Sequence, residues 1–106
     1  MNTALFKVRD DLILGYEISD HCTADDSDEQ GKIVCSAVSS AAFMAANTIT
    51  EIIGAKADAV VAEAFMGLTV TEKLDECQDI LNGLHLHLSE LAQQFEQLIE
   101  IKILEV

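Results

Sequence analysis

Residues 33–54 carry the sequence IVCSAVSSAAFMAANTITEIIG, which we interpret as the central helix of the fold. Its larger apolar side chains recur every three or four residues, the spacing of one face of an α-helix. Most of the remaining residues are small or apolar as well, so we expect a helix that is buried over most of its surface. Gly54 stands where a C′ glycine ends such a helix. The series on the buried face is Val34, Val38, Ala41, Ala45, Ile49 and Ile52 or Ile53.

Before this helix, residues 5–19 predict a hairpin of two short strands. Apolar and polar residues alternate on either side of Asp10-Asp11, which is the period of a strand with one buried face. In the first strand Phe6 and Val8 alternate with Lys7 and Arg9. In the second strand the alternating apolar residues are Leu12, Leu14, Tyr16 and Ile18.

After the helix, residues 59–64 and 68–73 flank Met66-Gly67 and predict a second hairpin. The alternative left open is that residues 59–64 continue as helix. A second helix follows from an alternating four-three apolar spacing, and residues 98–106 predict a last strand. The order ββαββαβ predicts an α+β fold: a single domain over residues 1–106, with two helices packed on one face of a mixed or antiparallel sheet. The second helix is marked by Cys77, Leu81, Leu84, Leu88, Leu91 and Phe95.

Composition limits the classes of function. A chain of 106 residues has room for one hydrophobic core. No unbroken apolar run approaches the roughly 20 residues that span a bilayer, and the first ten residues lack an export signal, so we expect a cytoplasmic protein with no membrane contact. Three cysteines are an odd number, which favours reduced thiols. With a net charge of −13 and six Lys and Arg, the chain suits a basic protein partner and not a nucleic acid.

One segment has the layout of a catalytic site. His21 follows the second predicted strand, residues 23–32 form a polar, acidic loop that we expect to be mobile, and Cys35 comes at the opening of the central helix. A helix N-terminus stabilises a thiolate and its free N–H groups bind an oxyanion, while a neighbouring imidazole takes the thiol proton. On spacing alone, a buried inert cysteine and a surface histidine remain the alternative interpretation.

The piece Ile33-Val34-Cys35-Ser36-Ala37-Val38-Ser39 closely resembles the central motif of the ribosomal-processing cysteine protease family, and His21 stands where that family has its histidine. The resemblance implies a Cys-His dyad that removes the N-terminal extension of large-subunit ribosomal protein number twenty-seven through a thioester. It also implies a homodimer that uses no cofactor. Carried over here, Cys35 is the nucleophile, His21 the general base and acid, and Ser39 a supporting residue one helical turn after the nucleophile.

The chain departs from the family pattern around the histidine and before the cysteine. Asp20, Cys22 and Thr23 replace a glycine before the histidine and an alanine-glycine pair after it, and Lys32 replaces an acidic residue. These changes support an alternative function, a catalytically impaired protein that keeps the fold and binds a basic ribosomal partner without cleaving it. Cys22 is also a candidate redox partner that caps Cys35 as a disulfide.

Three metal-site interpretations fail on spacing. Residues 26–31 imitate the first half of a calcium loop, but its twelfth position is Ala37 instead of glutamate. His85 and His87 are two residues apart in a predicted helix and point to different sides. His21-Cys22 with Cys35 lacks a paired zinc spacing. We therefore predict no metal, and take Cys77 as a core residue.

Overall fold

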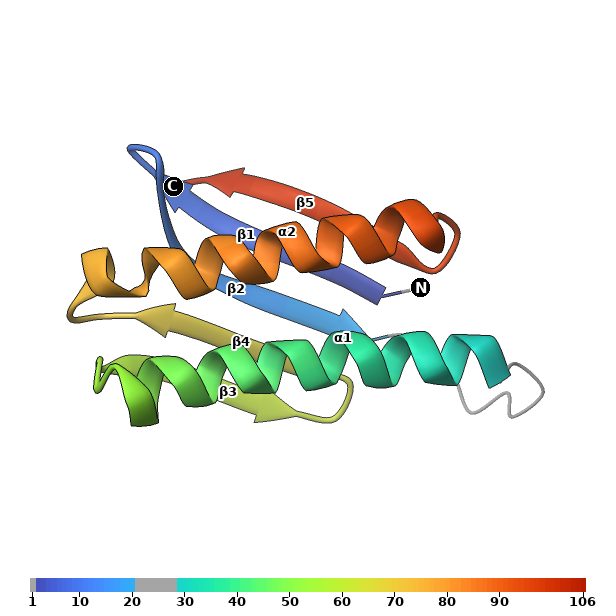
Figure 1. Ribbon diagram of the computed structural model, residues 1–106, viewed down its shortest axis with the longest axis horizontal. Helices are drawn as coiled ribbons and strands as arrows, with labels where there is room; N and C mark the ends of the chain where they lie inside the picture. Colours follow the sequence, from blue (N-terminus) through green and yellow to red (C-terminus); the bar gives the residue numbers. More distant parts are fainter. Residues whose placement is uncertain (1, 21–28) are drawn as a thin grey trace.

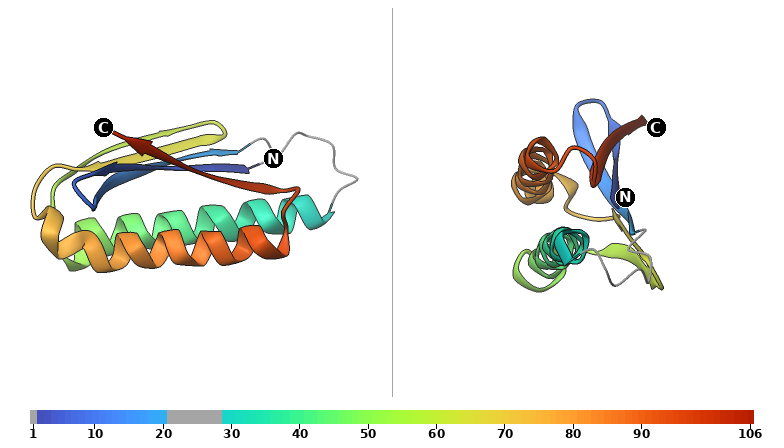
Figure 2. Two further views of the ribbon diagram at one scale, coloured as in Figure 1. Left: turned by 90° about the horizontal axis from the view of Figure 1, so that it is seen from above. Right: turned by 90° about the vertical axis from the view of Figure 1, so that its right-hand side faces the viewer.

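The computed structural model describes residues 2–20 and 29–106. These residues form one five-stranded sheet with two long helices side by side on one of its faces (Figures 1 and 2). The predicted α+β class and the order ββαββαβ are confirmed. The elements are β1 (Asn2–Arg9), β2 (Leu12–Asp20), α1 (Glu29–Asn47) with its π-helical extension η1 (Thr48–Ile52), β3 (Ala57–Ala62), β4 (Phe65–Val70), the 3₁₀ turn η2 (Leu74–Cys77), α2 (Gln78–Gln94) and β5 (Ile99–Glu105).

The sheet is mixed, with the strand order β3-β4-β2-β1-β5. Strand β1 pairs antiparallel with β2 and parallel with β5, while β4 pairs antiparallel with both β2 and β3. The three strands β1, β2 and β5 therefore bring the start of the chain, the end of the first hairpin and the start of the last strand to one end of the sheet. That end also receives the beginning of α1 (Figure 1).

The first hairpin contains a bulge that the alternating pattern did not predict. Asp10 and Asp11 both have positive φ, 51° and 66°, as a tight primed turn requires. Lys7 pairs with Gly15 and Val8 with Ile13, so Leu14 is an extra residue in β2. Tyr16 and Ile18 face the core as expected, but Ile13 is buried in place of the two leucines beside it. The prediction that Leu12 and Leu14 line the buried face was wrong, because the bulge shifts the side-chain period.

The second hairpin is present, but its turn lies earlier than predicted. Strand β3 ends at Ala62 and β4 begins at Phe65, with Ala64 at a positive φ of 59° in the turn. Met66-Gly67 belongs to β4, where Met66 faces the core and Gly67 pairs with Val60. The alternative of a helix over residues 59–64 is also wrong. A non-glycine residue at positive φ has no signature in the sequence. The turn was therefore predicted at Gly67, since glycine is the residue most typical of turns.

The core lies between the sheet and the two helices, and it links particular strands to particular helices. The buried Tyr16 hydroxyl donates to the Ala42 backbone oxygen over 2.7 Å and joins β2 to α1. Burial raises the pKa of Tyr16, which keeps the phenol a neutral donor. The ring of Phe6 on β1 meets His85 on α2 edge to face at 4.9 Å. The first contact ties α1, which carries the cysteine motif, to β2, and the second ties α2 to β1.

The central helix begins four residues earlier than predicted. Residues 29–32 belong to α1 and not to the polar loop, whose other residues lie outside the described ranges. Gly54, at φ 74°, follows the helical segment as predicted. Residues 29–52 are long and apolar enough by length and composition alone to cross a membrane, which differs from the expectation based on unbroken apolar runs. One side of this helix packs into the core, and its other side leaves apolar residues in solvent.

Candidate active site

Cys35 is the seventh residue of α1 and is only 8% exposed. We predicted it at the opening of the helix, where free N–H groups and the helix dipole act on a thiol. In the structure the first four residues of α1, whose N–H groups are free of helical bonds, are 29–32. The dipole acts mainly within the first turn, so its effect on Cys35 is small. The predicted place of Cys35 at the opening of the helix was therefore wrong, whereas the binding of an oxyanion by helix-start N–H groups stays a prediction.

A buried polar contact lies next to Cys35 instead. The Sγ atom of Cys35 is 3.2 Å from Oδ1 of Asn2, the first described residue of β1. Asn2 is itself 3% exposed, and its Nδ2 donates to the backbone oxygen of Leu98 over 3.2 Å. Strand β1, helix α1 and the residue just before β5 therefore meet at one amide.

The state of the cysteines differs from the expectation of reduced thiols. Cys35 is disulfide-bonded in the structure, whereas Cys77 is free and buried. Cys77 belongs to the core cluster, as predicted, and burial raises the pKa of its thiol. The third cysteine of the chain, Cys22, lies outside the described residues.

The predicted base, His21, also lies outside the described residues, but the strand that leads to it is described. Strand β2 ends at Asp20, and the Cα partner of Asp20 in β1 is Asn2. His21 is the next residue along the chain. The last described residue before the histidine is thus paired with the residue whose side chain touches Cys35. Lys32 is exposed in the first turn of α1, three residues before the cysteine.

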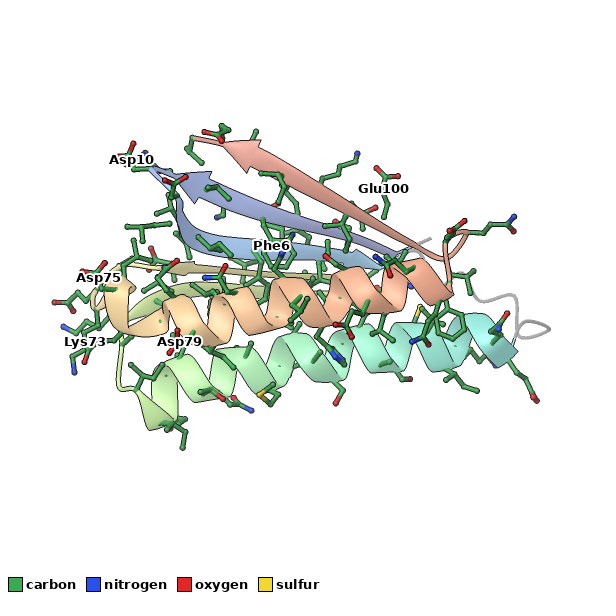
Figure 3. All side chains as sticks on the ribbon, turned by 45° about the horizontal axis from the view of Figure 1, so that its top comes forward. Phe6, Asp10, Lys73, Asp75, Asp79 and Glu100 are labelled. Atoms are coloured by element: carbon green, nitrogen blue, oxygen red, sulfur yellow. The ribbon has the colours of Figure 1, made fainter. Side chains whose placement is uncertain are left out.

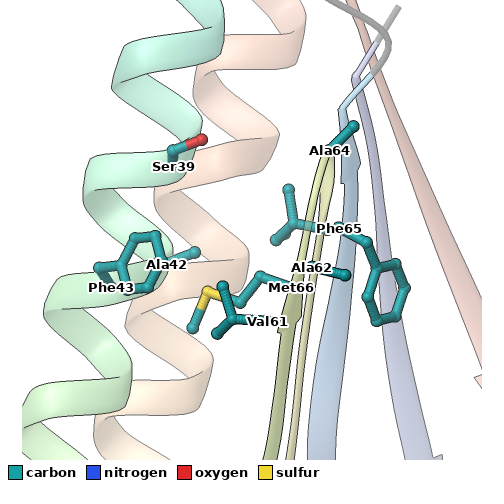
Figure 4. A pocket seen from close by; sticks show the side chains of 9 residues that line it. Ser39, Ala42, Phe43, Val61, Ala62, Ala64, Phe65 and Met66 are labelled. Atoms are coloured by element: carbon teal, nitrogen blue, oxygen red, sulfur yellow. The ribbon is translucent and has the colours of Figure 1, made fainter.

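A hollow of about 190 Å³ begins one helical turn beyond Cys35. Ser39 and Phe43 border it from α1, and Val61 and Met66 point into it from β3 and β4 (Figure 4). The ring of Phe65 lies on the other side of the strands. The supporting role of Ser39 stays a prediction, but its place is now given: it stands between the cysteine and an apolar hollow large enough for a side chain.

Acidic side chains gather at one end of the molecule. Three of the labelled acidic residues, Asp10, Asp75 and Asp79, lie toward the opposite end from the start of α1, while Glu100 lies on β5 (Figure 3). Among residues 2–20 and 29–106, no three His, Cys, Asp or Glu side chains come together as a metal site. His85 packs on Phe6, while His87 borders a groove between the two helices.

Comparison with known proteins decides the family. The family model described as cysteine protease Prp matches residues 1–100. The chain belongs to this family. The family is one of cysteine proteases, as the motif around Cys35 implied. Comparison with curated proteins finds no match.

Solved structures share the fold of this Prp-family chain at low identity. A Streptococcus mutans protein has a TM-score of 0.88 at 18% identity, and the alignment covers 100% of this chain and 96% of that one. The essential ribosomal processing protease Prp from S. aureus was solved with a substrate peptide (TM-score 0.85) and with a covalently linked product peptide (TM-score 0.84). Each of these two is 20% identical and covers 97% of this chain and 99% of the other.

Sequence reasoning missed two parts of this site. Asn2 looked like an ordinary polar residue before a strand, because its burial depends on β5 arriving from the far end of the chain. The strand side of the hollow was missed because the second hairpin turn was placed too late. The signal for Asn2 was its phase: it precedes Ala4 and Phe6 at steps of two and so shares their buried face.

Proposed function

We propose that this chain is a cysteine endopeptidase that removes the N-terminal extension of large-subunit ribosomal protein number twenty-seven. Membership of the Prp family over residues 1–100 carries the proposal. Cys35 acts as nucleophile and His21 as general base and acid. The position of Cys35 supports this role, because its sulfur lies at the end of the sheet where β2 leads into His21 and one turn before the apolar hollow.

The reaction is an acyl transfer in two steps. The Cys35 sulfur bonds to the carbonyl carbon of the scissile peptide while His21 accepts the thiol proton. The C–N bond then breaks, and His21 gives that proton to the leaving amine. Water next attacks the thioester with His21 as base, which releases the acid product and restores the thiol. The hollow bordered by Phe43, Val61 and Met66 would receive an apolar side chain of the peptide.

The cleavage assay uses the reduced full chain and a peptide that spans the N-terminal extension and the first residues of the mature ribosomal protein. We expect two fragments, cut at one bond, in a reaction that an alkylating agent blocks. A peptide with the residues on both sides of that bond replaced by glycine is the matched control, and it should stay intact. Tight binding without fragments would contradict the protease and favour the alternative, a fold-retaining protein that binds its partner without cleavage.

Redox chemistry would control this site. Cys35 is disulfide-bonded and Cys77 is free, so we propose Cys22 as the partner of Cys35. A small-molecule disulfide can form this bond by exchange: it takes two electrons and two protons from the thiol pair and leaves as two thiols, and a thiol reductant reverses the reaction. We also propose that the protein works in the cytoplasm, where reducing conditions keep such bonds open. The assay therefore includes a reductant, and the oxidised chain is expected to be inactive.

We further propose that the protein is a homodimer that meets its second copy through the outer side of the helices. A groove of about 550 Å³ runs between α1 and α2 and is mostly apolar. Met44, which borders it, is 52% exposed, and Ile33 and Ile52 on the same helix are 68% and 79% exposed. A helix that is apolar on all sides is usually covered on all sides. A second copy would provide that cover by the same surface.

Sedimentation of the wild-type protein is expected to give twice the mass of one chain. Met44→Asp should shift it to a single chain, because a charge would enter the shared groove. Leu86→Asp is the matched control: Leu86 is also exposed, at 61%, but does not border the groove. A monomeric wild type, or equal effects of the two substitutions, would contradict the proposal that the groove is the dimer interface. The groove would then be a candidate binding surface for the ribosomal partner.

A further inference from the structure

Asn2 is an unusual residue for its place, because a polar side chain is buried there at the start of a strand. Asn2 is 3% exposed, and no other polar or charged residue in the part of the chain that the structure describes is buried in this way. Its backbone N–H donates to the Leu98 oxygen over 2.8 Å, and its side-chain Nδ2 donates to the same oxygen over 3.2 Å. A buried amide of this kind needs partners for both ends.

These hydrogen bonds fix which way the amide points. The Leu98 carbonyl oxygen can only accept, so the Asn2 NH₂ group must face it. The other end of the amide, Oδ1, must then face Cys35, whose Sγ lies 3.2 Å away. Turning the amide over would place Oδ1 against the Leu98 oxygen and leave that oxygen without its side-chain donor. In the structure Cys35 is disulfide-bonded and its sulfur carries no hydrogen, so the contact seen there is a close approach of sulfur and oxygen. Once the disulfide is reduced, the amide offers an acceptor, and not a donor, to the thiol.

We propose that Asn2 is a positioning residue for Cys35: its Oδ1 accepts the S–H hydrogen of the reduced thiol and holds Cys35 as a neutral donor in one orientation. This inference rests on the proposed role of Cys35 as nucleophile. A hydrogen bond to the neutral form of a group disfavours its charged form. Cys35 would then wait as a thiol and give up its proton to the base during attack, instead of resting as a preformed thiolate.

The charged residues on the elements around Cys35 stay the same when only Asn2 is changed. Lys32 lies three residues before Cys35 on α1, and Asp20 is paired with Asn2 on β2. Glu96, in the connection to β5, borders a shallow hollow together with Gln30 and Leu98. His21, the proposed base, lies outside the described residues. Substitutions at Asn2 therefore report the effect of the amide against a constant background.

The test is the pH dependence of Cys35 alkylation by iodoacetamide in the reduced protein, with the labelled site followed by mass spectrometry. Asn2→Ala and Asn2→Asp both lose the side-chain bond to Leu98, so both should lower the midpoint of thermal unfolding by a similar amount, about 5 °C. Their effects on the thiol should be opposite. Removing the acceptor should make Cys35 react about threefold faster at neutral pH, and a carboxylate in its place should slow it about tenfold by raising the thiol pKa.

A purely structural role predicts something else: equal losses of stability with the same alkylation profile as wild type. That result, or shifts of both variants in one direction, would overturn the proposal. If either variant fails to fold, the wild type gives the answer. The NMR shift of the Asn2 side-chain carbonyl carbon should follow the Cys35 titration and stay constant in Cys35→Ala, and a constant shift in wild type would equally overturn it.

These readings need no substrate, so they separate this inference from the proposed function. Opposite shifts in a protein that cleaves no peptide would uphold the Asn2 contact and refute the protease. Peptide cleavage together with unchanged alkylation profiles would uphold the protease and refute the Asn2 contact. In an active enzyme, Asn2→Asp should lower kcat with little change in KM, because the contact is to the nucleophile and not to the peptide.

Discussion

Cys35→Ala is expected to abolish peptide cleavage, lowering kcat/KM by about 10⁴-fold or more, because the substitution removes the atom that forms the thioester. Cys35→Ser should be almost as inactive, since a serine hydroxyl is hardly ionised near neutral pH. His21→Ala should give a loss of similar size if the two residues act as a unit. Steady-state cleavage of the ribosomal-protein peptide measures all three variants.

Cys77→Ala is the matched control for this series. Cys77 is a cysteine of the same chain, fully buried at the start of α2 and remote from the candidate site. Its loss should cost about 1 kcal/mol of stability through the small cavity it leaves, without changing kcat/KM of the folded protein. If Cys77→Ala removed activity and Cys35→Ala retained it, the assignment of the nucleophile would be refuted.

Gly15→Ala is expected to cause the largest loss of stability of any single methyl group added to the sheet. A Cβ at Gly15 would lie 2.0 Å from the Leu68 backbone oxygen and 2.8 Å from the Thr69 Cα. Both atoms belong to the backbone of β4, so no side chain can turn aside to make room. Overpacking usually costs 1–3 kcal/mol, and separation of β2 from β4 should bring it to about 3 kcal/mol or more. The midpoint temperature of thermal unfolding should then fall by about 12 °C.

Gly67→Ala gives the comparison at a neighbouring position of the same sheet. There a new Cβ would meet the Phe65 ring at 3.2 Å, a side chain that is half-buried and free to shift. We expect a change in stability of less than about 1 kcal/mol. Equal effects of the two substitutions would mean that β2 and β4 do not approach as closely as the structure shows.

The fold was largely predictable from the sequence because its elements have clear periods. The four-three spacing that begins at Cys77 corresponds to α2, with Leu81, Leu84 and Leu88 in the core. The local pattern gave the wrong buried face at the start of β2, where one extra residue changes the register. Leu14 has the same apolar character as its neighbours, so nothing in the sequence marks it as the bulged residue. The bulge lies in the pairing of β2 with β1, which only the assembled sheet shows.

The candidate site was predictable in its motif but not in its surroundings. The motif around Cys35 identified the family, yet the start of α1 was placed too late because residues 29–32 are polar and carry no apolar period. The contact with Asn2 joins residues 33 positions apart, and the Asn2 side chain also reaches Leu98, 96 positions away. Such contacts follow from the parallel pairing of β1 with β5, which no local pattern records.

The central claim, that Cys35 is the nucleophile of a ribosomal-protein protease, is tested most directly by the mass of the reaction intermediate. The reduced chain is mixed with the N-terminal ribosomal-protein peptide, quenched in acid within the first turnover, and analysed intact and after digestion. We predict a protein heavier by the acyl group of the N-terminal fragment, with the added mass on Cys35. Cleaved peptide with no adduct on Cys35, or an adduct on another residue, would contradict the claim.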